Sequence, residues 1–207
     1  VDLDGACFAE TSLEFIVDKK PVANALLNQI ECDDDLDGEF PFNTSTIESD
    51  VLNGQTGMLV SYFDENGDPL PSPLPNPFFT TTQTITIKVE NQLNNNCSAK
   101  TTVEFIVNPK PEFELDETAI YCLNLQPINV TTYNPNGTYS YKWKNENGEV
   151  ISSNFDAIIS SAGEYTVIAT SPEGCDSFPQ TITIEASNIA TITNEDIIIV
   201  DDSDNNS

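Results

Sequence analysis

The pentapeptide Val103-Glu104-Phe105-Ile106-Val107 decides the fold of this chain, because it reads as a strand and because it recurs. Val103, Phe105 and Val107 alternate with less apolar neighbours, which is the period of a half-buried β-strand. Ninety residues earlier the chain reads Leu13-Glu14-Phe15-Ile16-Val17, with the same Glu-Phe-Ile-Val. A strand that recurs without a gap indicates repeated β domains.

The cysteines follow the same offset of ninety residues. Cys7 falls on Cys97, and Cys32 falls on Cys122. Cys175 follows an alternating strand and a turn, as Cys97 does. This spacing predicts one repeat over residues 21–109 and a second over residues 110–187. We expect residues 1–20 to be the last strand of a preceding repeat and residues 188–207 to be the first strand of a following domain, so that the chain is an internal piece of a longer secreted protein.

The pattern between the cysteines predicts an all-β fold. Asn66-Gly67 and Asn147-Gly148 each stand between two alternating segments, which indicates a type I′ hairpin with positive φ at both central residues. The most helical stretch, Ile47–Leu52, is one or two turns at most. Each repeat has a leading strand, a central hairpin and two closing strands within 80 to 90 residues. That order predicts tandem immunoglobulin-like β-sandwich domains, stapled by disulfides, with Trp143 inside the second.

The charge of the chain excludes several classes of function. It has 34 acidic residues, seven lysines and no arginine or histidine, for a net charge of −27. Such a polyanion repels phosphate backbones, so we expect no nucleic-acid binding. Without histidine, the usual catalytic triads and imidazole-ligated zinc sites are excluded. No apolar run reaches the roughly 20 residues of a membrane span. The sequence therefore predicts a protein that is not an enzyme.

The five cysteines are expected to serve as staples of an exported protein. Each repeat opens near one cysteine and closes near another, which predicts the pairs Cys32–Cys97 and Cys122–Cys175. Cys7 then closes an earlier repeat and stays unpaired within this chain.

One acidic segment has the spacing of a cation loop. Asp33, Asp35 and Asp37 before Gly38 match the first half of a D-x-D-x-D-G calcium loop, in which alternate carboxylates supply oxygen ligands. The twelfth position is Thr44 instead of a bidentate glutamate, so an EF-hand is rejected. Two interpretations stay open: an irregular Ca²⁺ site, or a solvated acidic turn beside a disulfide.

A group of aromatic residues also has two interpretations. Tyr139, Tyr141 and Trp143 share one face of a predicted strand. They form either a platform on which a sugar stacks or part of an ordinary sandwich core. Burial of Trp143 would decide for the core.

Several motifs carry a family resemblance. In the first repeat these are Cys-Asp-Asp-Asp-Leu-Asp-Gly at 32–38, Leu52-Asn53-Gly54-Gln55-Thr56-Gly57, Leu70-Pro71-Ser72-Pro73 and Cys97; in the second they are Gly-Glu-Tyr-Thr-Val at 163–167 and Gly174-Cys175. Together they resemble the immunoglobulin-like and PKD-like repeats of large Bacteroidetes (flavobacterial) cell-surface proteins, of the gliding-motility and adhesin type. Leu36 departs from the pattern, since a small residue is expected there.

The resemblance implies export across the outer membrane by the type IX secretion system and an extracellular, cell-surface location. The implied partners are neighbouring repeats of the same polypeptide, the secretion machinery during export, and a surface or glycan ligand. We expect a non-catalytic stalk or adhesion segment that serves surface attachment or gliding. The alternative is a carbohydrate-binding accessory module of an exported enzyme.

Overall fold

The computed structural model describes residues 11–14, 17, 19–123, 127–133 and 138–187. The chain divides into two compact units, an N-terminal unit of residues 1–107 and a C-terminal unit of residues 108–207. The division falls next to the predicted boundary at Pro109. The strands expected within 1–20 and 188–207 lie largely or wholly outside the described residues.

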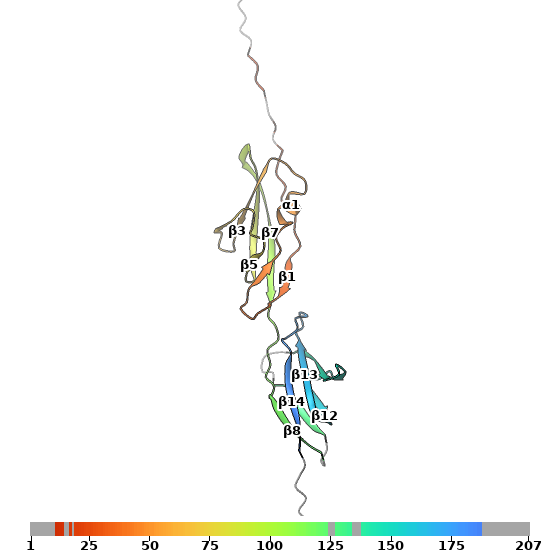
Figure 1. Cartoon of the computed structure of the whole chain (residues 1–207). Coiled ribbons are helices and arrows are strands. Elements are labelled where there is room, and N and C mark those ends of the chain that lie inside the picture. The colour runs from red at the N-terminus through yellow and green to blue at the C-terminus, as the bar shows by residue number, and fades with distance from the viewer. Residues whose placement is uncertain (1–10, 15–16, 18, 124–126, 134–137, 188–207) are drawn as a thin grey trace, which may run out of the picture. The chain divides into compact units, whose positions relative to one another are not determined.

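The N-terminal unit is a sandwich of a five-stranded and a two-stranded sheet (Figure 1). The larger sheet has the order β1-β7-β6-β3-β4 and the smaller pairs β2 with β5. One short helix, α1 (Ile47–Leu52), has the bounds of the predicted helical stretch. The strands are β1 (Gln29–Cys32), β2 (Phe40–Phe42), β3 (Met58–Phe63), β4 (Pro69–Leu70), β5 (Phe78–Thr80), β6 (Gln83–Asn91) and β7 (Asn94–Asn108).

The C-terminal unit has the same two-layer construction. Its five-stranded sheet has the order β8-β14-β13-β10-β11, and β9 pairs with β12. The first strand of this order, β8, runs parallel to β14, the last strand of the unit, while the other pairs are antiparallel. The strands are β8 (Thr118–Cys122), β9 (Ile128–Thr131), β10 (Ser140–Asn145), β11 (Val150–Ser152), β12 (Asp156–Ile159), β13 (Gly163–Thr170) and β14 (Gln180–Ser187).

The two units are therefore repeats of one topology. The order β1-β7-β6-β3-β4 becomes β8-β14-β13-β10-β11 when each strand is replaced by its counterpart. Tyr62 of β3, paired with Ile87 of β6, has the same place as Trp143 of β10, paired with Val167 of β13. The predicted repeat and the immunoglobulin-like sandwich class are confirmed.

Alternation along the strands builds a separate core in each unit. Every second side chain of β6, from Ile85 to Val89, is buried, and β13 shows the same pattern from Tyr165 to Ala169. In the N-terminal unit Phe42 packs edge-on against Phe105 with ring centroids 4.9 Å apart, which joins the small sheet to the large one.

The turns at the two Asn-Gly pairs differ from the prediction. Gly67 and Gly148 have positive φ, but Asn66 and Asn147 do not. The Gly67 N–H donates to Asp64 O (3.0 Å) and the Asp64 N–H donates to Asp68 O (3.0 Å). This is a longer hairpin loop that ends in a left-handed glycine, so the type I′ assignment is wrong. The side chain of Asp64, which accepts the N–H groups of Asn66 and Asp68, holds the longer loop.

Candidate functional site

The acidic loop after β1 is organised around the side chain of Asp33. This residue is only 4 % exposed. One of its carboxylate oxygens accepts the backbone N–H groups of Leu36 (2.8 Å) and Asp35 (3.2 Å), and the other accepts that of Gly38 (2.8 Å). Gly38 has φ +84°, a conformation that favours glycine, and it directs its N–H back at Asp33. The loop is thus wound around a buried carboxylate.

The next two acids continue the same pattern toward solvent. The Asp35 carboxylate accepts the N–H of Asp37 (3.3 Å), and the Asp37 carboxylate accepts the N–H of Glu39 (2.7 Å). Oxygen atoms of Asp33, Asp35 and Asp37 lie within 4.8 Å of one another. The structure brings together all three acids that the sequence singled out.

Two carboxyl groups in this loop have shifted pKa values. Burial opposes ionisation of Asp33, but the backbone N–H groups of Gly38, Leu36, Asp35 and Asp37 outweigh it and hold its pKa below the ordinary value. For Asp35, the hydrogen bond from the Asp37 N–H favours the charged form. Partial desolvation, the charges of Asp37 and Asp34 and a hydrogen bond with the Asp37 side chain together outweigh that bond and raise the pKa. Negative charge is therefore crowded at Asp35.

Three converging carboxylates are ligands of the kind that Ca²⁺ prefers. The segment after the loop is committed elsewhere, because Pro41 lies in β2 opposite Phe79 and the Thr44 hydroxyl donates to Pro75 O (2.7 Å). Leu36 takes a left-handed conformation with φ +71°. The calcium site stays a prediction, as does the alternative of an acidic turn.

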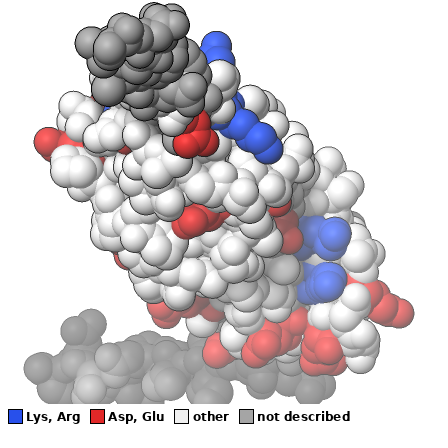
Figure 2. Space-filling model, turned by 90° about the horizontal axis from the view of Figure 1, so that it is seen from above, with Lys and Arg blue, Asp and Glu red and all other residues white. Residues whose placement is uncertain are grey.

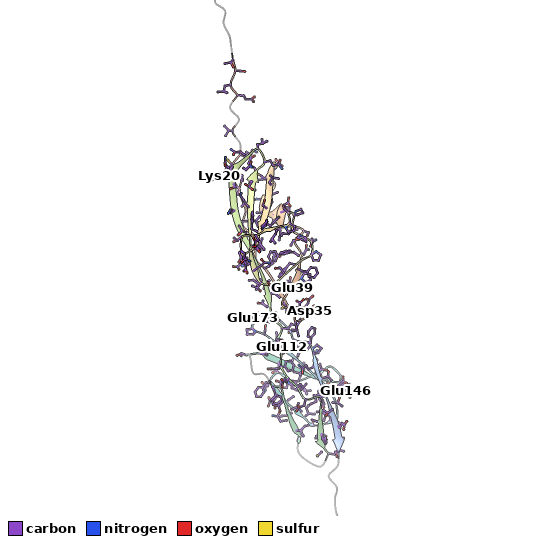
Figure 3. The ribbon with its side chains drawn as sticks, turned by 90° about the vertical axis from the view of Figure 1, so that its left-hand side faces the viewer. Lys20, Asp35, Glu39, Glu112, Glu146 and Glu173 are labelled. Carbon is purple, nitrogen blue, oxygen red and sulfur yellow. The ribbon has the colours of Figure 1, made fainter. Side chains whose placement is uncertain are left out.

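The loop lies at the end of the N-terminal unit where the chain leaves it. Phe40, directly after the loop, pairs with Thr80, and the nearby Thr82 hydroxyl accepts the N–H of Val107 (2.9 Å), the last residue of the unit. Figure 3 shows Asp35 and Glu39 at this end of the unit and Lys20 at its other end. Cys32, the last residue of β1, leads into the loop.

The state of the cysteines differs from the predicted pairing. Cys32 and Cys175 are each disulfide-bonded, whereas Cys97 and Cys122 are free thiols. The predicted pairs Cys32–Cys97 and Cys122–Cys175 are therefore wrong, because each contains one free thiol. Cys7 lies outside the described residues.

The parallel pairing of β8 with β14 explains this difference. Cys122 is the partner of Ser187, the last residue of β14, while Cys175 comes before the first residue of that strand. The two cysteines thus lie at opposite ends of an eight-residue strand, about 26 Å long. A disulfide needs Cα atoms within about 7 Å.

Cys175 lies in a tight turn at the N-terminal end of its unit. It is fully buried, and its sulfur lies 3.9 Å from Asn108 O, at the start of the unit. The Cys175 N–H donates to the Ser171 hydroxyl (3.3 Å), and the Ser171 N–H donates to Cys175 O (2.9 Å). The next residue, Asp176, forms a bridge with Thr170, so the turn is fixed from both sides.

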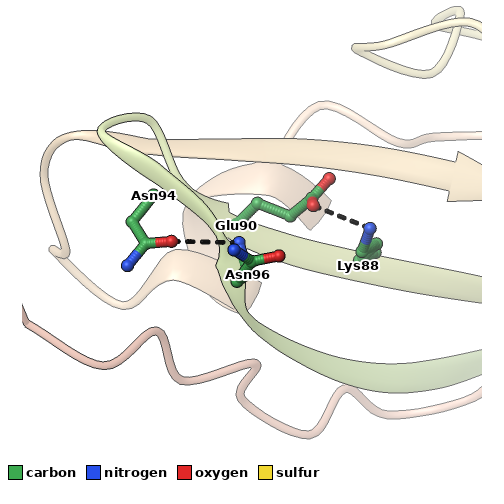
Figure 4. Close-up of polar contacts among 4 residues, drawn as sticks. All are labelled: Lys88, Glu90, Asn94 and Asn96. Carbon is green, nitrogen blue, oxygen red and sulfur yellow. Dashed lines mark hydrogen bonds and ion pairs between the residues drawn. The ribbon is translucent and has the colours of Figure 1, made fainter.

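Cys97 has the corresponding place in the N-terminal unit. It lies near the start of β7, in the irregular segment at the tip of the β6–β7 hairpin, directly before Ser98, which pairs with Glu90. Figure 4 shows this tip, where the Asn94 side chain accepts the N–H of Asn96 (3.2 Å) and Lys88 forms an ion pair with Glu90 (2.7 Å). The Asn91 side chain donates to Lys19 O (3.1 Å), so the tip is at the N-terminal end of the unit.

The aromatic group belongs to the core of the C-terminal unit. Trp143 is fully buried and its indole N–H donates to Asn154 O (3.1 Å). Tyr141 is also buried, with its ring against Phe113 at 5.8 Å, and Tyr139 packs partly buried against the same core. A sugar cannot stack on a ring without an exposed face, so the predicted platform is wrong and the core interpretation is confirmed.

The surface is acidic but not uniformly so. On the face that Figure 2 shows, uncharged residues cover most of the surface, and acidic side chains and lysines stand in small separate groups. No helix among the described residues is long and apolar enough to cross a membrane.

Residues 28–111 match the model of one family, the Flavobacterium inter-domain disulphide bond domain. The matched segment contains Cys32, the acidic loop and Cys97. No curated protein matches the chain.

Among solved structures, the chain is similar to the fibronectin(III)-like modules of CbhA from Clostridium thermocellum. The identity is 17 %, with 62 % of this chain and 77 % of that one covered and a TM-score of 0.34. It is also similar to immunoglobulin domains 1–4 of Sidekick-1, at 13 % identity over 81 % of this chain and 48 % of that one, with a TM-score of 0.40. The chain thus spans about half the length of the Sidekick-1 structure.

Proposed function

We propose that the chain is a non-catalytic structural segment of an exported multidomain protein, in which a Cys32–Cys175 disulfide joins the two immunoglobulin-like units. The observation that carries this proposal is the state of the sulfurs: Cys32 and Cys175 are bonded, while Cys97 and Cys122 are not.

A count of the sulfurs supports this pairing. The chain has five cysteines, and Cys97 and Cys122 are excluded as partners. If Cys7 were bonded to Cys32, no sulfur of the chain would remain for Cys175, and the reverse holds for a Cys7–Cys175 bond. Both cysteines are bonded within one chain only if they are bonded to each other.

The position of each cysteine within its own unit also supports the pairing. Cys32 leads into the loop at the end of the N-terminal unit that Val107 leaves, and the Cys175 sulfur lies beside Asn108, which begins the next unit. Strand β7 runs through this junction to Asn108 and is followed by Pro109 and Pro111. The family description for residues 28–111 names an inter-domain disulfide.

A second covalent connection between the two units suits a stalk that has to stay extended. Domains joined only by a short segment move relative to each other by default, and a second covalent connection removes most of that freedom. Disulfides persist outside the reducing cytosol, which agrees with an extracellular location. The specific role is surface attachment or gliding as part of a protein exported by the type IX system; this role rests on the sequence resemblance. The carbohydrate-binding alternative loses its main support, because Trp143 is buried.

Peptide mapping without reduction tests the pairing. The 207-residue chain is folded in a glutathione redox buffer, alkylated in denaturant and digested. We expect one linked peptide containing Cys32 and Cys175, with Cys97 and Cys122 alkylated. A Cys32–Cys97 or Cys122–Cys175 peptide would overturn the proposal.

A distance measurement tests the structural role. Spin labels on one exposed position of each unit, for example Leu59 and Ile158, report the spread of distances between the units. For this readout Cys7→Ser, Cys97→Ser and Cys122→Ser are present throughout, so that only the two introduced cysteines carry a label. Adding Cys32→Ser and Cys175→Ser should broaden the distribution while each unit keeps its circular dichroism. An equally narrow distance distribution without the disulfide would contradict the proposed connection between the units.

Protease treatment of intact cells that make the protein tests the surface location. A segment that is protected from the protease would contradict that location.

A further inference from the structure

We propose that Cys97 and Cys122 each form a disulfide with a cysteine of an adjoining unit of the same kind. Cys97 would be linked to the preceding unit and Cys122 to the following unit. The inference rests on the proposed function, because it extends the Cys32–Cys175 connection along the polypeptide. The partner in each case is the cysteine of a neighbouring immunoglobulin-like unit.

The first step is the equivalence of Cys122 with Cys32. Each is the last residue of its strand, Cys32 of β1 and Cys122 of β8, and these strands hold the same place at the edge of equivalent sheets. Cys122 lies beside Ser187, where the chain leaves the C-terminal unit. A sulfur in the position of the bonded Cys32 therefore stands at the C-terminal end of the second unit, with its thiol free.

The second step is the equivalence of Cys97 with Cys175. Cys97 lies in the irregular first residues of β7, and Cys175 lies in the connection between β13 and β14. Each comes one residue before a residue that pairs with the preceding strand. Ser98 after Cys97 pairs with Glu90, and Asp176 after Cys175 pairs with Thr170. Both turns also contact the start of their own unit, through Lys19 O in one case and Asn108 O in the other. Cys97 is thus the N-terminal counterpart of a bonded cysteine.

Each unit therefore carries one sulfur at its C-terminal end and one at its N-terminal end. In the bond proposed here between the two units, the C-terminal sulfur of one unit, Cys32, meets the N-terminal sulfur of the next, Cys175. The same rule gives Cys122 a partner equivalent to Cys175 in a following unit, and it gives Cys97 a partner equivalent to Cys32 in a preceding unit. Neither thiol is deeply buried, since both cysteines are half-exposed.

The chemistry of each link is that of disulfide formation. One S–S bond forms as two S–H bonds break. The two protons and two electrons pass to an oxidant of the disulfide class, whose own S–S bond breaks to give two thiols. Cys7 precedes Cys97 by ninety residues, which is the offset of the sequence repeat. This spacing predicts that Cys7 belongs to a preceding repeat.

The experiment compares the 207-residue chain with the parent polypeptide isolated from the cells that export it. Both are alkylated in denaturant and mapped without reduction. In the chain alone, folded in the glutathione redox buffer, Cys97 and Cys122 should be alkylated or carry glutathione, and neither should be linked to another cysteine of the chain. In the parent, each should appear in a linked peptide whose other half comes from sequence outside residues 1–207, with the Cys97 partner before Val1 and the Cys122 partner after Ser207.

Three results would overturn the inference. The first is a parent polypeptide in which both thiols are alkylated, or one that has no flanking cysteine. The second is a link between Cys97 or Cys122 and the same residue of a second copy, which would indicate a covalent dimer. The third is a link between Cys97 and Cys122 themselves. Loss of the Cys32–Cys175 peptide is scored separately, since it contradicts the proposed function and leaves the flanking links to be read from the same map.

Discussion

Cys122 is the register partner of Ser187, so the last residue of β8 and the last residue of β14 lie side by side at one end of the C-terminal unit. The parallel pairing of the first and last strands produces this relationship. It places Cys122 where the chain leaves the unit, while Cys175 lies beside Asn108, where the chain enters it. A disulfide between Cys122 and Cys175 within the C-terminal unit is therefore excluded by distance.

The first prediction concerns the buried carboxylate of the acidic loop. Asp33→Asn should lower the free energy of unfolding of the N-terminal unit by about 2 kcal/mol, because the amide removes charge-assisted hydrogen bonds and turns an N–H toward the Gly38 N–H. Denaturant titration at neutral pH measures the change. Asp34→Asn is the matched control: this neighbour is exposed, and its change should stay within about 0.5 kcal/mol.

The pKa of Asp33 adds a pH dependence to the same pair of variants. Because its pKa is lower in the folded protein than in the unfolded chain, the stabilisation is present above the unfolded value, near 3.8, and is lost as the pH falls through the folded value. The stability difference between the original chain and Asp33→Asn should therefore shrink as acid is added below that range. A difference that stays constant through acid would show that the carboxylate charge plays no part.

The second prediction is that calcium stabilises the N-terminal unit. A cation that binds between Asp33, Asp35 and Asp37 would relieve the repulsion among their three carboxylates. Binding only to the folded loop would add about 1 to 3 kcal/mol when calcium is 10 to 100 times its Kd. Thermal melting in EDTA and in millimolar calcium measures the shift. Asp35→Asn should abolish it and Asp34→Asn should keep it; identical midpoints in both solutions would leave the loop as an acidic turn.

Much of this architecture was predictable from the sequence, because it depends on local patterns. The alternation in β6 and β13, the helix at Ile47–Leu52 and the burial of Trp143 all follow from which side chains are apolar and at what spacing. The cluster of Asp33, Asp35 and Asp37 was also predictable, since the residues that form it are consecutive in the chain.

The disulfide pairing was not predictable in the same way, because it depends on the direction of two strands far apart in the sequence. The sequence puts Cys122 and Cys175 at the two ends of one repeat, and an antiparallel arrangement of β8 and β14 would have brought them together. The parallel arrangement separates them. The prediction of type I′ hairpin turns was wrong for a local reason. The side chains of Asp64 and Asn145 accept backbone N–H groups and stabilise a longer loop.

The third prediction compares two buried tyrosines of the C-terminal unit. Among the residues that the structure describes, the buried Tyr141 hydroxyl has no hydrogen-bond partner, whereas the Tyr165 hydroxyl donates to Ser161 O (3.0 Å). Tyr141→Phe removes a polar group that is not satisfied, so it should leave the unit as stable as before or more stable by about 1 kcal/mol. Tyr165→Phe should destabilise it by about 1 kcal/mol. Denaturant midpoints of the two variants test this, and equal losses would contradict the assignment of their partners.

The last prediction concerns alkaline pH and Tyr62 of the N-terminal unit. Burial first, and then the charge of Glu48, raise the pKa of this tyrosine from 10.0 to about 12. Below pH 10 the phenol is neutral in both the folded and the unfolded chain, so it has no effect on the pH dependence. Above pH 10 the unfolded chain loses the proton first, and stability falls until the pH passes the folded pKa. The shift corresponds to a loss of about 1 kcal/mol at pH 11 and about 3 kcal/mol in all. Tyr62→Phe cannot ionise, so its stability should decline less steeply between pH 10 and pH 12. Denaturant titrations of both proteins at half-unit steps of pH measure the difference, which isolates the contribution of Tyr62 from that of all other groups. Parallel curves would show that the Tyr62 hydroxyl reaches solvent, and that the core of the N-terminal unit is more open at β3 than its 1 % exposure indicates.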